Sequence, residues 1–323
     1  MKFFRVCMYL LLGVFAVCAV ADARLTIAAA GTALRLWATA VVPALLPFFV
    51  AARALLLLGA APFLARLLSP LMRLLGYPVP GAYALAVSLL GGYPGGAKAV
   101  CELKAEGAVT PEEAARLSLL CHTSGPLFTA GTAACSLLQR PQWGLPLLVC
   151  HYAACFCSAS LLALRAPVPA RSAPRAPAHT PLSLGAILSR SVTDGINTML
   201  LICGCMVFFG VVIALLPLPA GNLGAAAAGL LEMTAGIARL SGDAAFPLAC
   251  ALLSFSGACI CLQALSLLDG ICRPLRFFAA RLLCGVLGGL LGMLFQATGN
   301  LLAPAACAAL WITLCGLFRK LFA

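Results

Sequence analysis

The sequence predicts an all-α polytopic membrane protein. Of its 323 residues, 63% are hydrophobic and only 9% are charged, whereas charged residues make up about 25% of an average soluble domain. The apolar runs are long enough to cross a bilayer as helices, which takes about 20 residues. These runs lack the period-2 alternation of membrane strands, so we expect the spans to be helical.

The charge and the cysteines exclude several classes of protein. The net charge of +12 does not indicate nucleic-acid binding, because the cations lie at the ends of apolar runs and in one linker. That pattern is typical of cytoplasmic loops that face anionic lipid. Most of the 17 cysteines lie in apolar runs without neighbouring histidines or carboxylates. We interpret them as packing side chains and predict no metal and no cofactor; a metal or redox role for the C-x-C pairs is the alternative.

Residues 1–35 are predicted to form an N-terminal span and its connection. Lys2 and Arg5 precede an apolar run that ends in Ala-Asp-Ala. This arrangement fits a first span with a cytoplasmic N-terminus, and it also fits a cleaved signal peptide. We favour the span, because the rest of the chain is membrane-embedded.

Two further segments precede the centre of the first half. Leu36–Gly59 is the second predicted span, and we expect Pro43 and Pro47 to break its helix midway. Pro62–Leu75 has arginines on one face and leucines opposite, which predicts an amphipathic helix at the membrane interface.

The stretch Leu89–Lys98 organises the first half, and it follows the apolar run Ala82–Leu90. Its glycines and proline disfavour a continuous helix, because glycine costs about 1 kcal/mol and proline about 3 kcal/mol in a helix interior. Broken backbone at membrane depth is tolerated only where protein or a water-filled cavity covers it. Such breaks indicate the binding site of a transporter. A tight loop outside the bilayer is the alternative.

A second interruption follows. Thr110 is predicted to cap a helix that begins at Pro111, with Glu113 closing a capping box. That helix runs into Cys121–Phe128, which is polar, contains glycine and proline, and lies between apolar flanks. Trp143–Leu164 is then predicted to be an uninterrupted span.

Arg165–Pro181 is rich in proline, alanine and arginine, so we predict an extended cytoplasmic linker. It separates a first repeat, residues 36–164, from a second repeat, residues 182–275, and residues 276–323 hold the C-terminal spans. Later spans are predicted at Ile196–Leu216, Leu223–Leu240, Phe246–Leu268, Phe277–Phe295 and Leu301–Phe318. With broken or re-entrant half-helices included, we expect about eight to ten membrane segments.

The two halves share an order of features: a span, an interrupted apolar segment, and a second interruption built on a Ser-Gly pair. The pairs are Ser124-Gly125 and Ser256-Gly257, and Leu231–Ile237 matches the break at Gly91–Lys98. Paired breaks in corresponding positions fit two inverted repeats with a substrate between them. The alternative is that small residues recur in membrane helices for close packing.

Two ionisable side chains are candidates for function. Lys98, beside the N–H groups of Gly95 and Gly96, is suited to hold a carboxylate; the alternative is that it snorkels to the interface and pairs with Glu102. Glu232 lies in an apolar stretch, where an ionisable group is a functional candidate by default. It is suited to couple transport to protons or to balance Lys98, and a carboxylate at a helix start is the alternative.

Neutral polar groups complete the predicted site. The predicted substrate-binding residues are Gly92, Tyr93, Pro94, Gly95, Gly96, Lys98, Thr123, Ser124, Gly125, Glu232, Thr234, Ser256, Gly257 and Gln263. The sequence has no H-E-x-x-H or Walker A motif and no clustered nucleophile and base, so we predict neither enzyme chemistry nor ATP hydrolysis.

The motifs at Gly92–Lys98 and Cys121–Phe128 resemble those of the sporulation integral membrane proteins of the YlbJ (SpoV-type) family, which carry the nucleoside-recognition, or Gate, domain. Leu231–Ile237 and Ser254–Gly257 extend the resemblance into the second half, together with Gln263. The resemblance covers roughly residues 36–281. It implies that both repeats are Gate-like and that the fold is similar to that of concentrative nucleoside transporters.

The resemblance also implies a function. The expected protein is a secondary transporter of a small anionic metabolite in a sporulating bacterium. The suggested substrate is dipicolinic acid, moved from the mother cell across the outer forespore membrane. Its partners are then the bilayer and the substrate, and a homo-oligomer is an open alternative. His122 departs from the family pattern, where an amide is expected. A nucleoside carrier and a non-transporting scaffold for sporulation partners are the other functions considered.

Overall fold

The computed structural model describes residues 2–93, 95–164 and 182–322, and all regular structure in these ranges is helical. Six of these helical runs are long and apolar enough to cross a membrane, and three shorter apolar helices accompany them. The prediction of an all-α polytopic membrane protein is therefore confirmed. The predicted linker Arg165–Pro181 and the predicted site residue Pro94 lie outside the described residues.

The helices fall on either side of the linker. Before it lie α1 (Lys2–Ala21), α2 (Ala23–Leu36), α3 (Val42–Leu55), α4 (Ala61–Leu75), α5 (Ala82–Gly91), α6 (Gly95–Ala105), α7 (Pro111–Leu120) and α8 (Gly144–Leu162). After it lie α9 (Leu184–Leu215), α10 (Gly221–Leu231), α11 (Met233–Ile237), α12 (Ala245–Phe255), α13 (Gly257–Leu267), α14 (Pro274–Thr298) and α15 (Leu302–Phe322).

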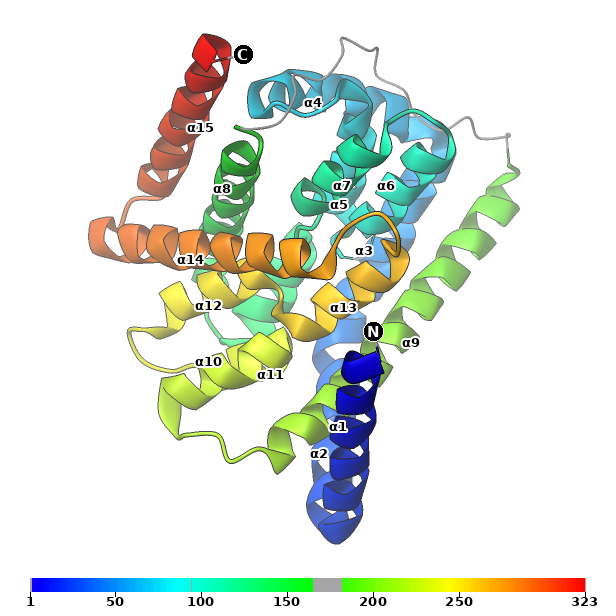
Figure 1. The fold of residues 1–323 in the computed structure, drawn as a ribbon, viewed down its shortest axis with the longest axis vertical. Helices are drawn as coiled ribbons and strands as arrows, with labels where there is room; N and C mark the ends of the chain where they lie inside the picture. The colour runs from blue at the N-terminus through cyan, green and yellow to red at the C-terminus, as the bar shows by residue number, and fades with distance from the viewer. Residues whose placement is uncertain (1, 94, 165–181, 323) are drawn as a thin grey trace.

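Helices α1 and α2 form a hairpin that packs along α9 at one end of the molecule (Figure 1). The side chain of Asp22 caps α2 by accepting a hydrogen bond from the N–H of Leu25, with N and O 3.0 Å apart. The rings of Phe15 and Phe208 join α1 to α9, with centroids 5.1 Å apart. The segment predicted as a first span is helical and packs against α2 and α9, and its part Met8–Ala21 is one of the shorter apolar helices.

The expected break at Pro43 and Pro47 is wrong. The helical run is continuous from Ala23 to Ala60, so the predicted boundary after residue 35 falls inside one helix. A π-helical segment, Trp37–Val41, comes directly before the prolines. Local π adjustments of this kind re-pair the backbone groups that a proline leaves without a donor.

Two other predicted elements are present as expected, and two predicted spans are interrupted. The capping box is present: Thr110 and Glu113 exchange hydrogen bonds at the start of α7. α4 occupies the segment predicted as an amphipathic helix. Leu223–Leu240 and Phe246–Leu268 are not intact helices, because α10–α11 and α12–α13 are interrupted where the Glu232 and Ser256 motifs predict.

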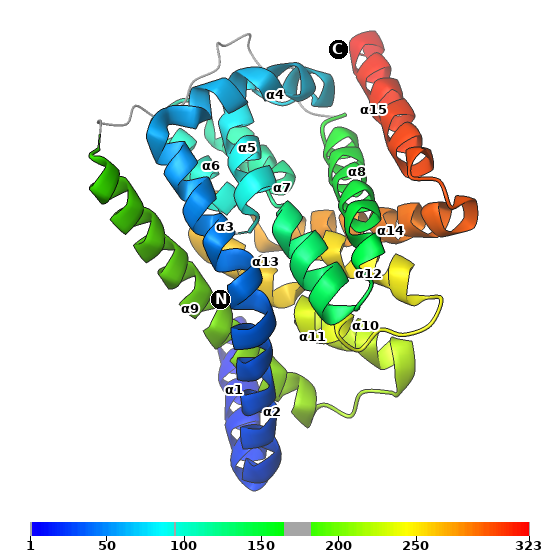
Figure 2. The ribbon, with the colours of Figure 1, turned by 180° about the vertical axis from the view of Figure 1, so that it is seen from behind.

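Each half thus contains two helix–break–helix units. In the first half they are α5–α6, and α7 followed by the π-helix Phe128–Leu137; in the second they are α10–α11 and α12–α13. α14 packs on both α8 of the first half and α12 of the second half (Figures 1 and 2). Many large apolar side chains of α1, α9, α14 and α15 are exposed, as expected of surfaces that face lipid.

Candidate functional site

In the first half, the two breaks lie against each other. Gly92, directly after α5, has a φ of +67°. A Cβ atom on Gly92 would lie 2.8 Å from the backbone N of Gly125, in the break after α7. The hydroxyl oxygens of Ser88 and Thr123 lie 2.9 Å apart and join the same two segments. Glycine is therefore required where the two backbones approach.

The first break is shorter than predicted, because only residues 92–94 lie between α5 and α6. Gly95, Gly96 and Lys98 belong to the beginning of α6. A Cβ atom on Gly96 would lie 2.1 Å from the carbonyl O of Cys121. Gly96 therefore allows close packing of α6 against the second break.

In the second half, the corresponding breaks also meet. Glu232, with an extended backbone, separates α10 from α11, and Ser256 separates α12 from α13. A Cβ atom on Gly257 would lie 3.0 Å from the backbone N of Met233. Gly257, like Gly125 in the first half, follows a serine and packs against the break of a neighbouring hairpin.

Hydrogen bonds connect the breaks of the two halves. The hydroxyl of Tyr93 donates to the carbonyl O of Leu253 at 2.9 Å, and His122 Nε2 lies 3.0 Å from Ser256 Oγ. The rings of Tyr93 and His122 contact each other, with centroids 4.6 Å apart. Ser256 has a φ of +75°, and a non-glycine residue in that conformation costs on the order of 1–3 kcal/mol. Strain of this kind is concentrated at functional sites.

His151 on α8 also connects the two halves, through hydrogen bonds to Ser124 and Ser254. Its Nε2 accepts a hydrogen bond from the backbone N–H of Ser124 at 2.9 Å. The other ring nitrogen, Nδ1, then carries the proton and donates to Ser254 Oγ at 3.2 Å. A neutral imidazole therefore connects the break after α7 to the end of α12.

Arg281 on α14 is a buried cation, with 2% of its surface exposed. Its guanidinium donates to the carbonyl O of Ser254, and its Nε lies 3.5 Å from the carbonyl O of Phe255. These carbonyls end α12, where a helix has no internal donors left and carries a partial negative charge. Arg281 therefore satisfies the helix end created by the break at Ser256.

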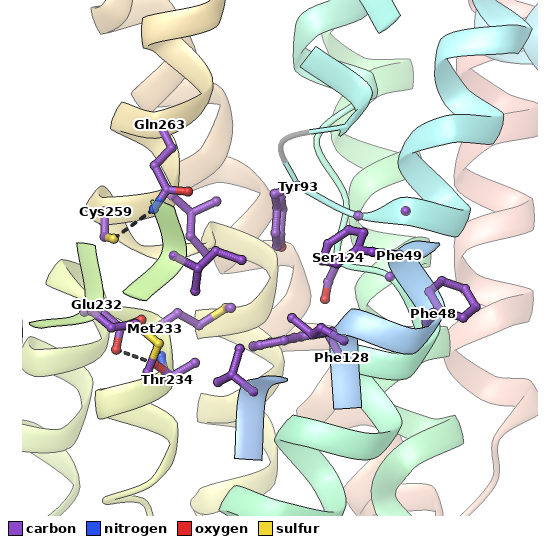
Figure 3. A pocket seen from close by; sticks show the side chains of 18 of the residues that line it. Phe48, Phe49, Tyr93, Ser124, Phe128, Glu232, Met233, Thr234, Cys259 and Gln263 are labelled. Carbon is purple, nitrogen blue, oxygen red and sulfur yellow. Dashed lines mark hydrogen bonds between the residues drawn. The ribbon is translucent and has the colours of Figure 1, made fainter. Parts of the chain in front are cut away.

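A cavity of about 50 Å³, which we call the inner cavity, lies where these segments meet. Phe49, Phe128, Ser124 and Tyr93 come from the first half, and Glu232, Thr234, Cys259 and Gln263 come from the second half (Figure 3). Aromatic and aliphatic side chains make up most of the wall. Since one water needs about 10–15 Å³, the cavity has room for a few waters in this conformation.

Glu232 takes the alternative role considered for it, a carboxylate at a helix start, and also borders the inner cavity. Its carboxylate caps α11, accepting hydrogen bonds from the N–H groups of Thr234 at 3.0 Å and Ala235 at 2.7 Å, and from the Thr234 hydroxyl. The helix N-terminus stabilises its negative charge. Glu232 is only 3% exposed, yet it borders the inner cavity. It is therefore both a helix cap and a wall of the cavity.

A larger cavity, the outer cavity, lies between α3, α5, α6 and α9 and has a volume of about 290 Å³. Phe49 and Gly91 line both cavities, so the two adjoin. Lys98 lines the outer cavity and not the inner one. Lys98 and Glu232 therefore do not form the single site that the sequence predicts, because the side chain of Lys98 leaves α6 on the side that faces α3 and α9.

The alternative considered for Lys98, an ion pair with Glu102, is not found among the described residues. Glu102 Oε2 instead accepts a hydrogen bond from the hydroxyl of Tyr83 at 3.2 Å. The ion pair of the outer cavity joins Arg53 Nε on α3 to Asp194 Oδ2 on α9, which lie 2.8 Å apart. The outer cavity therefore has charged walls, whereas the inner cavity is mainly apolar.

The predicted substrate-binding residues are divided among three places. Those on the inner cavity are Gly92, Tyr93, Ser124, Gly125, Glu232, Thr234 and Gln263. Gly95 and Lys98 line the outer cavity. Gly96, Thr123, Ser256 and Gly257 lie in the packed contacts between breaks.

Several residues at this centre were not among those predicted from the sequence. His151 and Arg281 are ionisable side chains inside apolar runs, which is a signal for function that the sequence offers. Phe49 and Phe128 gave no such signal, because an aromatic side chain that faces a cavity looks the same in sequence as one that faces lipid. Within residues 2–93, 95–164 and 182–322, no group of three or more His, Cys, Asp or Glu side chains is placed to hold a metal ion.

Comparison with known proteins identifies a relative. The chain is 30% identical over 208 residues to the sporulation integral membrane protein YlbJ of Bacillus subtilis (strain 168). The match covers 57% of this chain and 50% of that protein, so it spans half of the relative's length. No protein-family model and no solved structure matches the chain. The resemblance to YlbJ-type sporulation membrane proteins, predicted from the interrupted motifs, is confirmed.

Proposed function

We propose that this integral membrane protein is a secondary carrier that acts during sporulation. Its substrate is a small anionic metabolite, dipicolinic acid first among them, which it moves from the mother cell across the outer forespore membrane. The observation that carries the proposal is that the broken segments of both halves line one cavity. Broken helices around a common site are typical of secondary transporters.

The order of elements supports an inverted-repeat carrier. Each half supplies two helix–break–helix units. In each half the Ser-Gly pair of the second unit packs against the break of the first unit. We propose that α5 to α8 and α10 to α14 are the corresponding parts of the two repeats. Their interface then holds the substrate, as expected for this class of carrier.

The side chains that line the inner cavity have the chemistry to bind a flat ring. The side chains of Tyr93, Phe49 and Phe128 offer aromatic faces, and Ser124 and Gln263 offer hydrogen bonds at the edge. A ring-sized substrate requires more room than the present cavity has. Transport would therefore require the halves to separate at the contacts of Tyr93 and His122.

Glu232 suggests coupling to protons. A carboxylate that borders the cavity would repel a bound anion unless it takes up a proton. Substrate and proton would then cross together. Glu232→Gln removes the charge but keeps only one of the two oxygens that cap α11, so the thermal unfolding of this variant is measured beside its uptake to separate the coupling role from the helix-capping role.

Uptake of labelled dipicolinate into proteoliposomes tests the proposal. We expect uptake by the natural protein to depend on an imposed pH gradient, and uptake by Glu232→Gln to lose that dependence. Glu106→Gln, the same change at an exposed position that lines neither cavity, is the matched control. Absence of uptake under every imposed gradient, with the protein folded, would contradict the carrier function.

A nucleoside carrier is a second candidate, and one observation favours it. Apart from Glu232, the side chains on the inner cavity are uncharged, which suits a neutral ring substrate as well as an anion. Competition experiments separate the two: uridine should compete with uptake if the substrate is a nucleoside. If small dicarboxylates compete and uridine does not, the nucleoside function is wrong.

A further inference from the structure

The outer cavity has a distribution of charge that the carrier mechanism does not yet use. Arg53, Lys98, Glu102 and Asp194 all line it. Its volume of about 290 Å³ compares with about 50 Å³ for the inner cavity. Because Phe49 belongs to both walls, a molecule in the outer cavity is separated from the inner cavity by little more than this ring and the backbone at Gly91.

The two carboxylates of the outer cavity already have donors. Arg53 Nε contacts Asp194 Oδ2 at 2.8 Å, and the hydroxyl of Tyr83 donates to Glu102 Oε2 at 3.2 Å. Lys98 differs: its side chain is exposed and has no hydrogen bond or ion pair with any residue that the structure describes. Lys98 and Glu102 therefore both lack a charged partner, but Glu102 has a hydrogen bond from Tyr83, so the group left open to a ligand is the cation Lys98.

We propose that the outer cavity is a second binding site, which takes a small organic anion bearing one or two carboxylates before the anion reaches the inner cavity. Arg53 is its main ligand, since a guanidinium binds a carboxylate through two parallel hydrogen bonds. Lys98 supplies a second positive charge. Asp194 is the group that occupies Arg53 while the site is empty. The passage of the anion from the outer to the inner cavity rests on the proposed carrier function, whereas its binding in the outer cavity does not.

This role gives the two members of the ion pair opposite effects. Replacing Arg53 removes the ligand, so the anion binds more weakly. Replacing Asp194 removes the competitor, so the anion binds at least as tightly as before. An ion pair that only held α3 against α9 would behave differently, because either replacement would then break the same contact.

Equilibrium binding of labelled dipicolinate to the purified full-length protein in lipid nanodiscs tests the site. For Arg53→Gln we expect affinity to fall by about tenfold or more, the effect of losing charge-assisted hydrogen bonds. Lys98→Gln should weaken binding by about threefold to tenfold, and Asp194→Asn should leave binding unchanged or tighter. Arg190→Gln on α9 and Lys104→Gln on α6, outside both cavities, are the matched controls.

Thermal unfolding of each variant is measured alongside. The site is wrong if Arg53→Gln and Asp194→Asn weaken binding equally, or if neither Arg53→Gln nor Lys98→Gln weakens it. If Arg53→Gln fails to fold, the loss of affinity in Lys98→Gln decides. Binding that follows the predicted pattern without any uptake would support this site and contradict the carrier. Uptake that ignores both cations would support the carrier and overturn this site.

Discussion

At the scale of single residues, the buried charge of Arg281 needs a physical account. A cation in a membrane protein is expensive unless hydrogen bonds and opposite charge compensate it. Here the compensation comes from the carbonyl groups at the end of α12, which the break at Ser256 leaves without internal donors. The break and the arginine therefore explain each other. In a low-dielectric interior, the carbonyl groups without donors and the unpaired guanidinium would each be destabilising alone.

The first prediction concerns this contact. Arg281→Met should lower the midpoint of thermal unfolding, because each buried carbonyl left without a donor costs about 1–3 kcal/mol. The purified protein in detergent is heated and followed by circular dichroism. Arg276→Met, at an exposed position on the same helix, should change the midpoint little. Equal midpoints for the two variants would mean that Arg281 does not stabilise the break.

At the scale of elements, the breaks depend on glycine at particular positions. Gly92 has a positive φ and no space for a Cβ atom, whereas a Cβ atom on Gly91, the last residue of α5, would meet nothing within 4 Å. The two neighbours therefore have different roles. Gly91 has the ordinary conformation of a helix, in which alanine is preferred to glycine.

The second prediction uses this pair. Gly92→Ala should destabilise the protein by about 1–3 kcal/mol, because its φ of 67° and ψ of −160° lie in a region open almost only to glycine, and by more because its Cβ atom would press on Gly125. Gly91→Ala should be neutral or stabilise by up to about 1 kcal/mol. Unfolding midpoints of the purified variants test the difference. A loss of stability of similar size in both would argue against a special backbone at Gly92.

Local signals in the sequence predicted most of these elements. The capping box at Thr110 and the interruptions at Ser124-Gly125 and Ser256-Gly257 were predictable because they depend on residues close together in the chain. Pro43 and Pro47 misled, since a π-helical turn absorbs a proline without ending a helix. The helix therefore continues through the two prolines for a local reason that residue types do not reveal.

The site was less predictable, because it depends on contacts between distant segments. Half of the predicted binding residues line the inner cavity, from Gly92 to Gln263. Lys98 does not, since its position around α6 directs it to another cavity. Neither the link from Ser124 through His151 to Ser254 nor the position of Arg281 at the end of α12 follows from local pattern. Such contacts exist only once the two halves pack together.

At the scale of the whole molecule, the cations are unevenly distributed between the two ends. α4, the end of α15 and the beginning of α9 lie at one end (Figures 1 and 2). There Arg319 Nη2 donates to the carbonyl O of Leu74 at 2.6 Å, and α4 contributes Arg66 and Arg73. The opposite end has the turn between α1 and α2, where Arg24 lies near Asp22 in the sequence.

The last prediction is the orientation in the membrane. Loops rich in Lys and Arg stay in the cytoplasm, so the end with α4 and the C-terminus of α15 should be cytoplasmic. A green fluorescent protein fused after Ala323 should then fluoresce in bacterial cells, and alkaline phosphatase fused there should be inactive. An epitope inserted at Pro219, in the connection between α9 and α10 at the other end of the molecule, should be accessible from outside. An active phosphatase together with a protected epitope would mean that the protein has the opposite orientation in the membrane. The outer cavity, with Lys98 and Arg53, would then have to be assigned to substrate release instead of entry.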